Sequence, residues 1–281
     1  LTEENYRDYI SAKDYAFLRP LNGTYSKWIT DKVTIHTIFK PFRQYMPTLY
    51  YQLSKRYDET QIIPLYNDEA GDTFEDVLEL IKEKQAVTAA PANGVSASTI
   101  EYREGSFFFD GEKLSESGLK TKLEGYRATI VIKEKVVTSE IVDNGVLNLI
   151  VFNEFGDNPV IGDAFFVFDE YETKPLRTYA QRKADSLEEE DVLDDKFKEI
   201  KAEVVDAASG MWRDKKVPHW DEITEVIDSL CRFVPQLEFF GAEIVISPEG
   251  FSITRMVNHP EYPACKPFSK ETSAYLSRKV A

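Results

Sequence analysis

The stretch GAEIVISPEGFSITRMVNHPEY, residues 241 to 262, carries the strongest structural signal in the chain. Two apolar-rich runs, Ala242 to Ile246 and Phe251 to Val257, flank a short segment that contains proline and glycine. Because those two residues favour tight turns, the stretch predicts a β-hairpin. Its polar content is unusual, since Glu243 lies in the first strand and Asn258 follows the second. These groups either line a binding site or form a solvated face.

The composition is that of a globular protein with a strong negative charge. Of the 281 residues, 42% are hydrophobic, and 34 Lys and Arg face 49 Asp and Glu for a net charge of -15. This charge argues against sequence-independent binding to nucleic acid or to an anionic membrane. No apolar run reaches the roughly 18 residues that a membrane span needs. The first residue is Leu rather than Met, which indicates a processed, trimmed or excised chain.

The cysteines are few and indicate a reducing compartment. Only Cys231 and Cys265 occur, and neither their number nor their spacing suggests a disulfide framework or a zinc site. We therefore expect a cytoplasmic protein.

The segment after residue 60 has the pattern of a small α+β unit. A capping motif at Asp72-x-x-Glu75 precedes apolar residues at helical spacing, which predicts an amphipathic helix buried through Phe74, Val77, Leu78 and Ile81. Strands, a hairpin turn at Asp110-Gly111, a helix around Glu116 to Glu124 and the strand TIVIKEKVV complete the unit.

The second half of the chain is expected to combine long strands with two helices. Two buried strands should flank a turn at residues 156 to 159. The run from Ser186 to about Ser209 predicts the longest helix, with a stripe formed by Leu193, Phe197, Ile200 and Val204. A further helix is expected from Trp220 to Phe233.

Several short sequence segments, separated along the chain, carry a family resemblance that covers the chain from about Asp14 to Pro263. These are LNGTYSKWITDK (21 to 32), NEFGDNPVIGDAFFVF (153 to 168), and VPHWDEI followed by FVPQLEFFGAEIVISPEGF (217 to 251). They resemble the sugar-transfer-associated ATP-grasp family of bacterial surface polysaccharide gene clusters. The resemblance implies an α+β ATP-grasp fold, with a small lid subdomain and a larger antiparallel sheet flanked by helices. It divides the chain into a helical and linker region (1–60), a lid-like subdomain (61–136) and a C-terminal subdomain with the closing hairpin (137–281).

The resemblance also implies a chemistry. ATP-grasp ligases phosphorylate a carboxylate with ATP and then let an amine displace the phosphate, so ATP and Mg²⁺ would be the cofactors if the activity is retained. Such a reaction requires cations around the transferring phosphoryl group and oxygen ligands that hold the metal against it.

The lid retains few of the expected phosphate-binding groups. Ala90 stands where the family has a lysine, and Gly94 remains of its glycine-rich loop. Lys32 resembles a family lysine that contacts nucleotide phosphates, although a surface lysine after a capping Asp31 explains it equally well.

Two neighbouring residues lie near the strand that meets adenine and ribose in the family. They are Lys133 and Glu134, and a half-exposed strand with alternating polar residues is the alternative for both. At the positions of two arginines in the family's larger sheet, this chain has Asn148 and Val167.

The hairpin supplies the metal ligands in the family, through an acid on the first strand and Glu-x-Asn on the second. By resemblance, Glu243 and Asn258 are the candidate metal ligands, whereas Met256 occupies the place of the key glutamate. If the turn has two or four residues, Glu243 shares a face with Thr254, Met256 and Asn258, which the family favours. If the turn has three residues, Glu243 instead faces Arg255 in a cross-strand ion pair.

Three functional hypotheses follow. The first is a divergent ATP-grasp-like protein with an eroded nucleotide site, which serves as a binding or scaffolding partner of a polysaccharide-modifying enzyme or fused domain. The second is an active ATP-dependent carboxylate–amine ligase, in which other cations such as Lys122, Arg127, Lys135 and Arg255 fill the vacant roles. The third, a sugar-nucleotide enzyme that stacks sugars on aromatic runs such as Phe107-Phe108-Phe109, has less support because such runs more often belong to a core.

Overall fold

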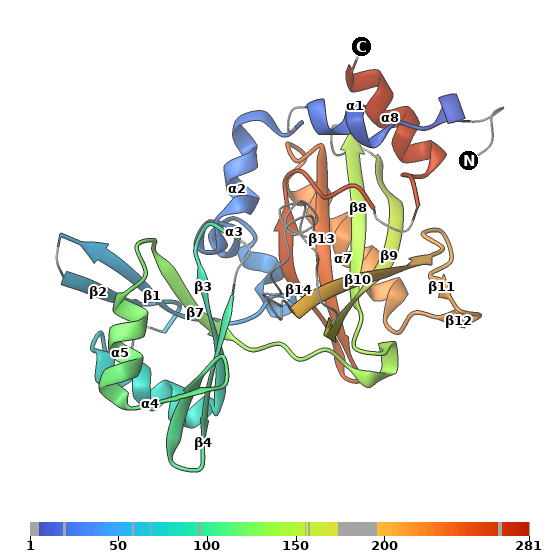
Figure 1. The fold of residues 1–281 in the computed structure, drawn as a ribbon. Helices are drawn as coiled ribbons and strands as arrows, with labels where there is room; N and C mark the ends of the chain where they lie inside the picture. Colours follow the sequence, from blue (N-terminus) through green and yellow to red (C-terminus); the bar gives the residue numbers. More distant parts are fainter. Residues whose placement is uncertain are drawn as a thin grey trace, which may run out of the picture.

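The computed structural model describes residues 6–18, 21–57, 59–67, 69–94, 97–154, 156, 158–173, 196–263 and 266–280. Two antiparallel sheets form separate layers, each with its own helices (Figure 1). None of the helices in these ranges is long and apolar enough to cross a membrane.

The first sheet has seven strands in the order β2-β1-β7-β3-β4-β5-β6. Their bounds are β1 Leu49–Arg56, β2 Glu59–Pro64, β3 Ala86–Pro91, β4 Ser98–Arg103, β5 Ser106–Phe109, β6 Glu112–Leu114 and β7 Ile130–Glu134. Helices α4 (Phe74–Lys84) and α5 (Glu116–Glu124) pack on one face of this sheet, where their apolar residues join one core cluster. The opposite face of the sheet is turned toward the second layer.

The expected helix α4 is confirmed, with its cap one residue later than predicted. Thr73 accepts a hydrogen bond from the Asp76 amide, and Asp76 accepts one from the Thr73 amide, which makes a capping box. The four apolar residues of the predicted stripe are all buried.

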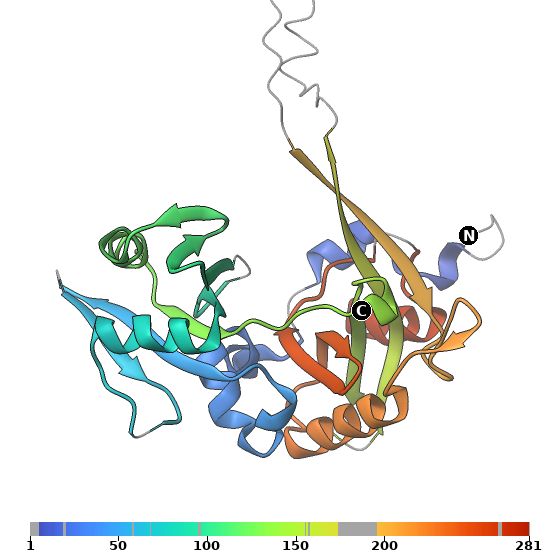
Figure 2. The ribbon, with the colours of Figure 1, turned by 90° about the horizontal axis from the view of Figure 1, so that it is seen from below.

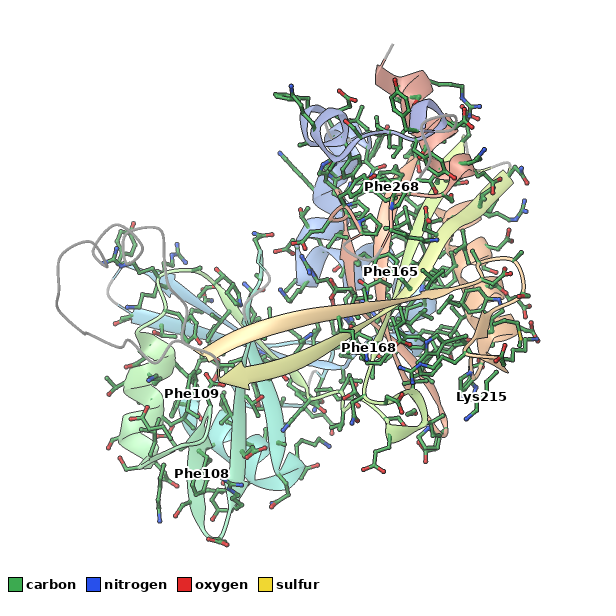
Figure 3. The ribbon with its side chains drawn as sticks, turned by 45° about the vertical axis from the view of Figure 1, so that its right-hand side comes forward. Phe108, Phe109, Phe165, Phe168, Lys215 and Phe268 are labelled. Atoms are coloured by element: carbon green, nitrogen blue, oxygen red, sulfur yellow. The ribbon has the colours of Figure 1, made fainter. Side chains whose placement is uncertain are left out.

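The aromatic run of β5 belongs mainly to the same core. Phe107 and Phe109 are buried, whereas Phe108 points to the other face and lies under the Arg103 guanidinium (Figure 3). Alternation along a strand explains why neighbouring phenylalanines separate in this way.

The second sheet has five strands in the order β10-β9-β8-β13-β14. The bounds are β8 Val146–Glu154, β9 Asn158–Thr173, β10 Lys196–Val205, β13 Phe239–Ser247 and β14 Gly250–Val257. Helix α7 (Trp220–Phe233), at the predicted bounds, covers one face with an apolar stripe, and a two-stranded ribbon, β11 (Met211–Trp212) with β12 (Lys215–Lys216), lies beside it. The predicted hairpin and the two long strands β8 and β9 are confirmed.

The other face of the second sheet is covered only in part. Helices α1 (Ala12–Phe17) and α8 (Lys270–Val280) pack there around Phe165, Phe239 and Phe268, at the upper end of the sheet in Figure 1. Asp163, 1% exposed, ties α8 to the sheet because the Ser269 amide and the Thr272 hydroxyl both donate to its carboxylate. The remainder of this face is called the open face below.

Short helical segments connect the two layers. They are α2 (Lys27–Thr30), α3 (Lys32–Ile38) and 3-10 turns at Gly23–Ser26, Lys40–Tyr45 and Glu140–Val142, whereas a further 3-10 turn, Tyr6–Asp8, precedes α1 and contacts α8.

The predicted helix from Ser186 to Ser209 is wrong in the part that the structure describes. Residues Lys196–Val205 form strand β10, which pairs with β9 from Val205 opposite Ala164 to Lys196 opposite Thr173. Figure 2 shows the two strands extending together beyond the body of the sheet. Pairing with a long partner strand overrode a spacing that also fits a helix. The start of the expected helix lies outside the described residues.

Candidate functional site

A cavity lies between the two layers. Its described lining contains three cationic side chains and no carboxylate, in a protein whose net charge is -15. The lining consists of Ile29, Thr30, Lys32, Ile35, His36, Met46, Pro47, Leu49, Gly94, Lys133, Ile253, Thr254, Arg255 and Met256. The cations come from α3, β7 and β14, so the two layers contribute jointly to one positively charged site.

Lys32 holds a loop of the first layer in place. It is the first residue of α3, where the Asp31 side chain caps the helix by accepting from the Thr34 amide. Its ammonium donates to the carbonyls of Pro91 at 2.6 Å and Gly94 at 2.8 Å. Burial, followed by the charges of Lys133 and Arg255, lowers the pKa of Lys32 to about 8. Lys32 is thus both a structural tether and a cation of the cavity.

Lys133 and Glu134 point to opposite sides of β7 and have different environments. Lys133 faces the cavity, and its ammonium has no hydrogen-bond acceptor among the described residues. Burial lowers its pKa, while the charge of Glu243 opposes that shift. Glu134 is exposed and accepts from the Thr48 amide at 2.9 Å, which fixes the start of β1 rather than lining the cavity.

The register of the first sheet shows how Lys133 relates to Ala90. Ala90 is opposite Val131, and Thr88 is opposite Lys133, so all four side chains share one face. Lys133 therefore presents its charge close to the position where Ala90 lacks one.

Gly94 contributes backbone rather than a side chain to this site. Its φ of +151° is a conformation that other residues rarely adopt, and its carbonyl accepts from Lys32.

The hairpin register differs from the one that the resemblance favours. The turn has two residues, since Ser247 pairs with Gly250, but a β-bulge follows in which Ile244 pairs with Ile253 and Glu243 with Arg255. Thr254 is the extra residue, and its hydroxyl donates to the Glu243 carbonyl at 3.1 Å. A bulge shifts the alternation by one residue, so the predicted face shared by Glu243 and Met256 is wrong.

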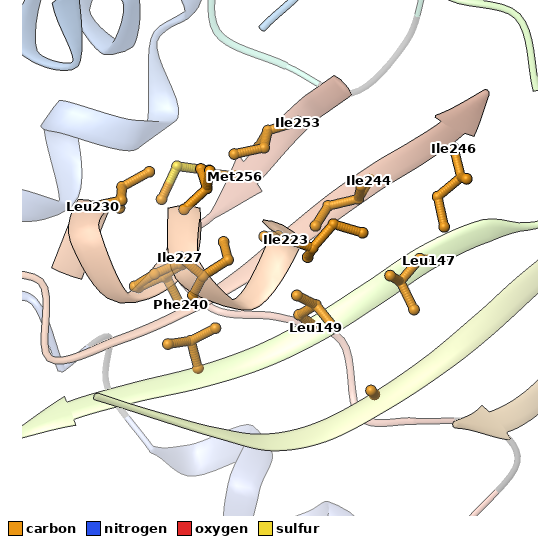
Figure 4. Close-up of a cluster of buried hydrophobic side chains, with 14 of the residues drawn as sticks. Leu147, Leu149, Ile223, Ile227, Leu230, Phe240, Ile244, Ile246, Ile253 and Met256 are labelled. Atoms are coloured by element: carbon orange, nitrogen blue, oxygen red, sulfur yellow. The ribbon is translucent and has the colours of Figure 1, made fainter. Parts of the chain in front are cut away.

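Met256 belongs to the core under α7. It is 4% exposed and packs with Ile253 and Leu230, as Figure 4 shows. The β14 residues on the side of Glu243 are Arg255 and Val257, which line a hollow on the open face together with Glu243. The strand pairing therefore sets Arg255, rather than Met256, across from Glu243.

The other polar candidates of the second sheet have local partners. The Asn258 side chain accepts from the Asn22 amide group at 2.8 Å, and Asn22 also bonds both backbone groups of Phe239. Asn148 donates to the Val146 carbonyl at 3.0 Å. Asn148 and Val167, which occupy the positions of two arginines in the family, line the open-face hollow.

These residues do not fit a bound Mg²⁺. Glu243 is paired with Arg255 at 2.6 Å, and the described residues hold no group of three or more His, Cys, Asp or Glu suited to a metal. Magnesium beside phosphates is usually held by one or two carboxylates together with waters and phosphate oxygens, and the candidate carboxylate Glu243 is already engaged by Arg255. The hollow contains one further carboxylate, Glu261, which is exposed.

Two residues of the cavity wall were hard to identify from sequence. Of the four cations named as possible substitutes, Arg255 alone lines the cavity, whereas Lys122 pairs with Glu112 and Lys135 with Glu101. The second position, His36, was overlooked because an isolated histidine carries no motif. It lies in the cavity wall, and burial together with nearby cations lowers its pKa to about 4, which keeps the imidazole neutral near pH 7.

Comparisons with known proteins show the fold. No protein-family model matches the chain, and no curated protein matches it in sequence. Among solved structures, it is similar to a D-alanine–D-alanine ligase from Bacillus anthracis (TM-score 0.50, 11% identity, 93% of this chain and 65% of that one). It is also similar to D-alanyl-alanine synthetase A from Vibrio cholerae O1 biovar eltor (TM-score 0.51, 10% identity, 94% and 66%).

A third similar structure is the ATP-grasp ligase PsnB complexed with a minimal precursor (TM-score 0.48, 11% identity, 92% of this chain and 64% of that one). The chain spans less than two thirds of the length of each of these three proteins. Two antiparallel sheets flanked by helices, together with the two D-alanine ligase structures, show the ATP-grasp fold that the resemblance implied.

Proposed function

We propose that this chain is a divergent ATP-grasp-like protein that binds a nucleotide through its phosphates in the cavity between the two layers, with little or no ordinary ligase activity. The observation that carries the proposal is the lining of the cavity, which combines Lys32, Lys133 and Arg255 with no described carboxylate. Converging cations in a partly apolar pocket favour a phosphate-bearing ligand.

The same site lacks the other half of the ligase chemistry. Phosphoryl transfer depends on a metal that bridges and neutralises the phosphates, and the described residues near Glu243 do not fit one. The loss of one oriented charge at such a site typically costs about 3 kcal/mol of transition-state stabilisation. Binding without turnover is the function that this combination supports.

The biological setting follows from the resemblance rather than from the geometry. We propose a cytoplasmic binding or scaffolding role in bacterial surface polysaccharide biosynthesis, beside a polysaccharide-modifying enzyme or a fused domain. The segments at 21–32, 153–168 and 217–251, which resemble the sugar-transfer-associated ATP-grasp family, support this setting.

An active ATP-dependent carboxylate–amine ligase is the second candidate. Lys133 favours this candidate. It lies on the same face of the first sheet as Ala90, so its ammonium supplies a positive charge near the position where the family has a lysine. Turnover separates the candidates, because a ligase releases phosphate from ATP in the presence of an acceptor and Mg²⁺, whereas a binding module does not.

The test is the melting temperature of the protein with ADP, with ATP and with inorganic tripolyphosphate. A ligand at about 100 times its Kd stabilises the folded state by about 2.7 kcal/mol, which corresponds to a rise of roughly 5 °C for a chain of this size. Lys133→Met should abolish most of the rise. Lys122→Met, which removes an exposed lysine outside the cavity, should leave it intact. The absence of a shift with all three ligands would refute the proposed function.

A further inference from the structure

We infer that the Arg255 guanidinium takes the place of a divalent metal ion in this cleft, so that the phosphate ligand binds in its metal-free form. The inference rests on the proposed function and adds the ionic form of the ligand. Four observations support it: the position of Arg255, its pairing with Glu243, the charge of the surrounding lining and its unused donors.

Arg255 lies where two recesses meet. It lines the cavity between the layers together with Lys32 and Lys133, and it also lines the hollow on the open face together with Glu243 and Val257. A ligand that extends from the cavity onto the second sheet would therefore pass this side chain.

The ion pair occupies the carboxylate that a metal would need. Arg255 Nη1 is 2.6 Å from Glu243 Oε1, and the two side chains keep 37% and 29% of their surface exposed. The bulge at Thr254 sets Arg255 opposite Glu243 on adjacent strands, so the sheet itself maintains the pairing. A metal ion at Glu243 would have to displace the guanidinium from Oε1 or bind Oε2 directly beside its positive charge.

The local charge also disfavours a metal and favours an anion. Lys32, Lys133 and Arg255 supply three positive charges, and Glu243 and Glu261 of the adjoining hollow supply two negative charges, which leaves 3 − 2 = +1. A divalent cation added to this group would be repelled, whereas a polyphosphate would be attracted.

The guanidinium retains donors for a ligand. The ion pair uses Nη1, and among the described residues no acceptor lies within hydrogen-bond distance of Nε or Nη2. An arginine presents its donors in a planar fork that matches phosphate oxygens. Glu243 orients that fork from one side and leaves its other edge free.

Isothermal titration with ADP and with tripolyphosphate tests the inference, first in excess EDTA and then in saturating MgCl₂. We expect binding in EDTA and an affinity about tenfold weaker in MgCl₂, because chelation removes two negative charges from the ligand and about 1.4 kcal/mol corresponds to tenfold. Binding that requires Mg²⁺ would overturn the inference while supporting the proposed function. No binding in either buffer would refute the proposed function itself.

Substitutions then identify the side chain responsible. Removal of the whole ion pair in Glu243→Gln/Arg255→Gln avoids leaving an unpaired charge and should weaken ADP binding in EDTA by at least about tenfold. Arg255→Lys should retain part of the affinity. Arg278→Gln, which removes a paired arginine of α8, is the matched control and should have no effect. Wild-type affinity in the double variant would overturn the inference.

The reverse substitution gives an independent readout. Arg255→Glu places a second carboxylate beside Glu243, so the variant should bind Mn²⁺ in the absence of nucleotide, whereas the wild-type protein should not. Direct binding of Mn²⁺ by the wild-type protein would overturn the inference.

Discussion

Met256→Glu distinguishes the register of the structure from the register that the resemblance favours. If Met256 shared the sheet face of Glu243, the new carboxylate would join Glu243 in a metal site. In the structure, Met256 lies on the opposite face, where it borders the cavity, is 4% exposed and packs against Ile253 and Leu230 beneath α7. The substitution should therefore place a carboxyl group in the largest apolar core of the molecule and destabilise the fold.

The magnitude follows from two contributions. Loss of the buried methionine costs about 2 kcal/mol. A glutamate in this core must remain protonated, and at about pH 7 that costs 1.36 kcal/mol for each unit above its ordinary pKa of about 4.3, or about 3.7 kcal/mol. The sum is between about 5 and 6 kcal/mol, which approaches the total stability of many domains.

The pH dependence provides a second signature of burial. When burial raises the pKa of a glutamate, the folded state keeps its proton at pH values where the unfolded chain has lost it. The resulting loss in the free energy of unfolding therefore grows as pH rises above about 4.3. Between about pH 5 and about pH 7 the penalty should increase by about 2.7 kcal/mol relative to the wild-type protein. A surface glutamate would show no such dependence.

Urea denaturation at both pH values measures these differences. Met256→Leu preserves volume and polarity and should cost less than about 1.5 kcal/mol. Arg255→Glu, on the open face, should remain folded. The argument fails if Met256→Glu is as stable as the wild-type protein, or if it gains Mg²⁺ binding.

Three further predictions concern the supports of the site. Asp163→Ala should destabilise the protein by about 3 to 5 kcal/mol in urea denaturation, because Lys266 and the buried end of α8 lose the carboxylate that they contact. As a control, Glu154→Ala, which removes an exposed carboxylate, should cost under about 1 kcal/mol. Asn22→Ala should cost about 2 to 4 kcal/mol through three lost hydrogen bonds, and equal costs for Asn22→Ala and Asn258→Ala would contradict the structural role of Asn22. Because the pKa of Lys32 is about 8 and its charge is lost above that value, titrations should show ADP affinity falling as pH rises through about 8. Lys32→Arg should remove most of this dependence, and an unchanged pH profile would exclude Lys32 from the binding site.

Much of the fold could be predicted because the signals are local. The cap before α4, the apolar stripe of α7 and the turn between β13 and β14 each lie within a few residues of the element that they define. Such signals depend on the chain's own chemistry rather than on distant partners.

Elements that depend on distant partners were misassigned or missed. β10 has an apolar spacing that also fits a helix, and its pairing with β9 decided the outcome. β1 lies between β2 and β7, and α8 is anchored through Asp163, which is 1% exposed and more than one hundred residues away in sequence. No pattern within either segment reports such a partner.

The candidate site was predictable in its parts but not in its assembly. Lys32 and Lys133 were named individually, yet their convergence with Arg255 depends on how the two layers meet. Glu243 was identified as a polar group of interest, and the bulge determined its partner.

The inserted Thr254 also affects how this hairpin is compared with distant relatives. The family's Glu-x-Asn spacing, counted back from Asn258, reaches Met256, whereas the strand pairing sets Arg255 on the side of Glu243. Excision of Thr254 would remove the irregularity and still leave Arg255 across from Glu243. A ligand assigned to this hairpin by residue spacing alone therefore falls on the face opposite Glu243, and the strand pairing gives the physically consistent correspondence.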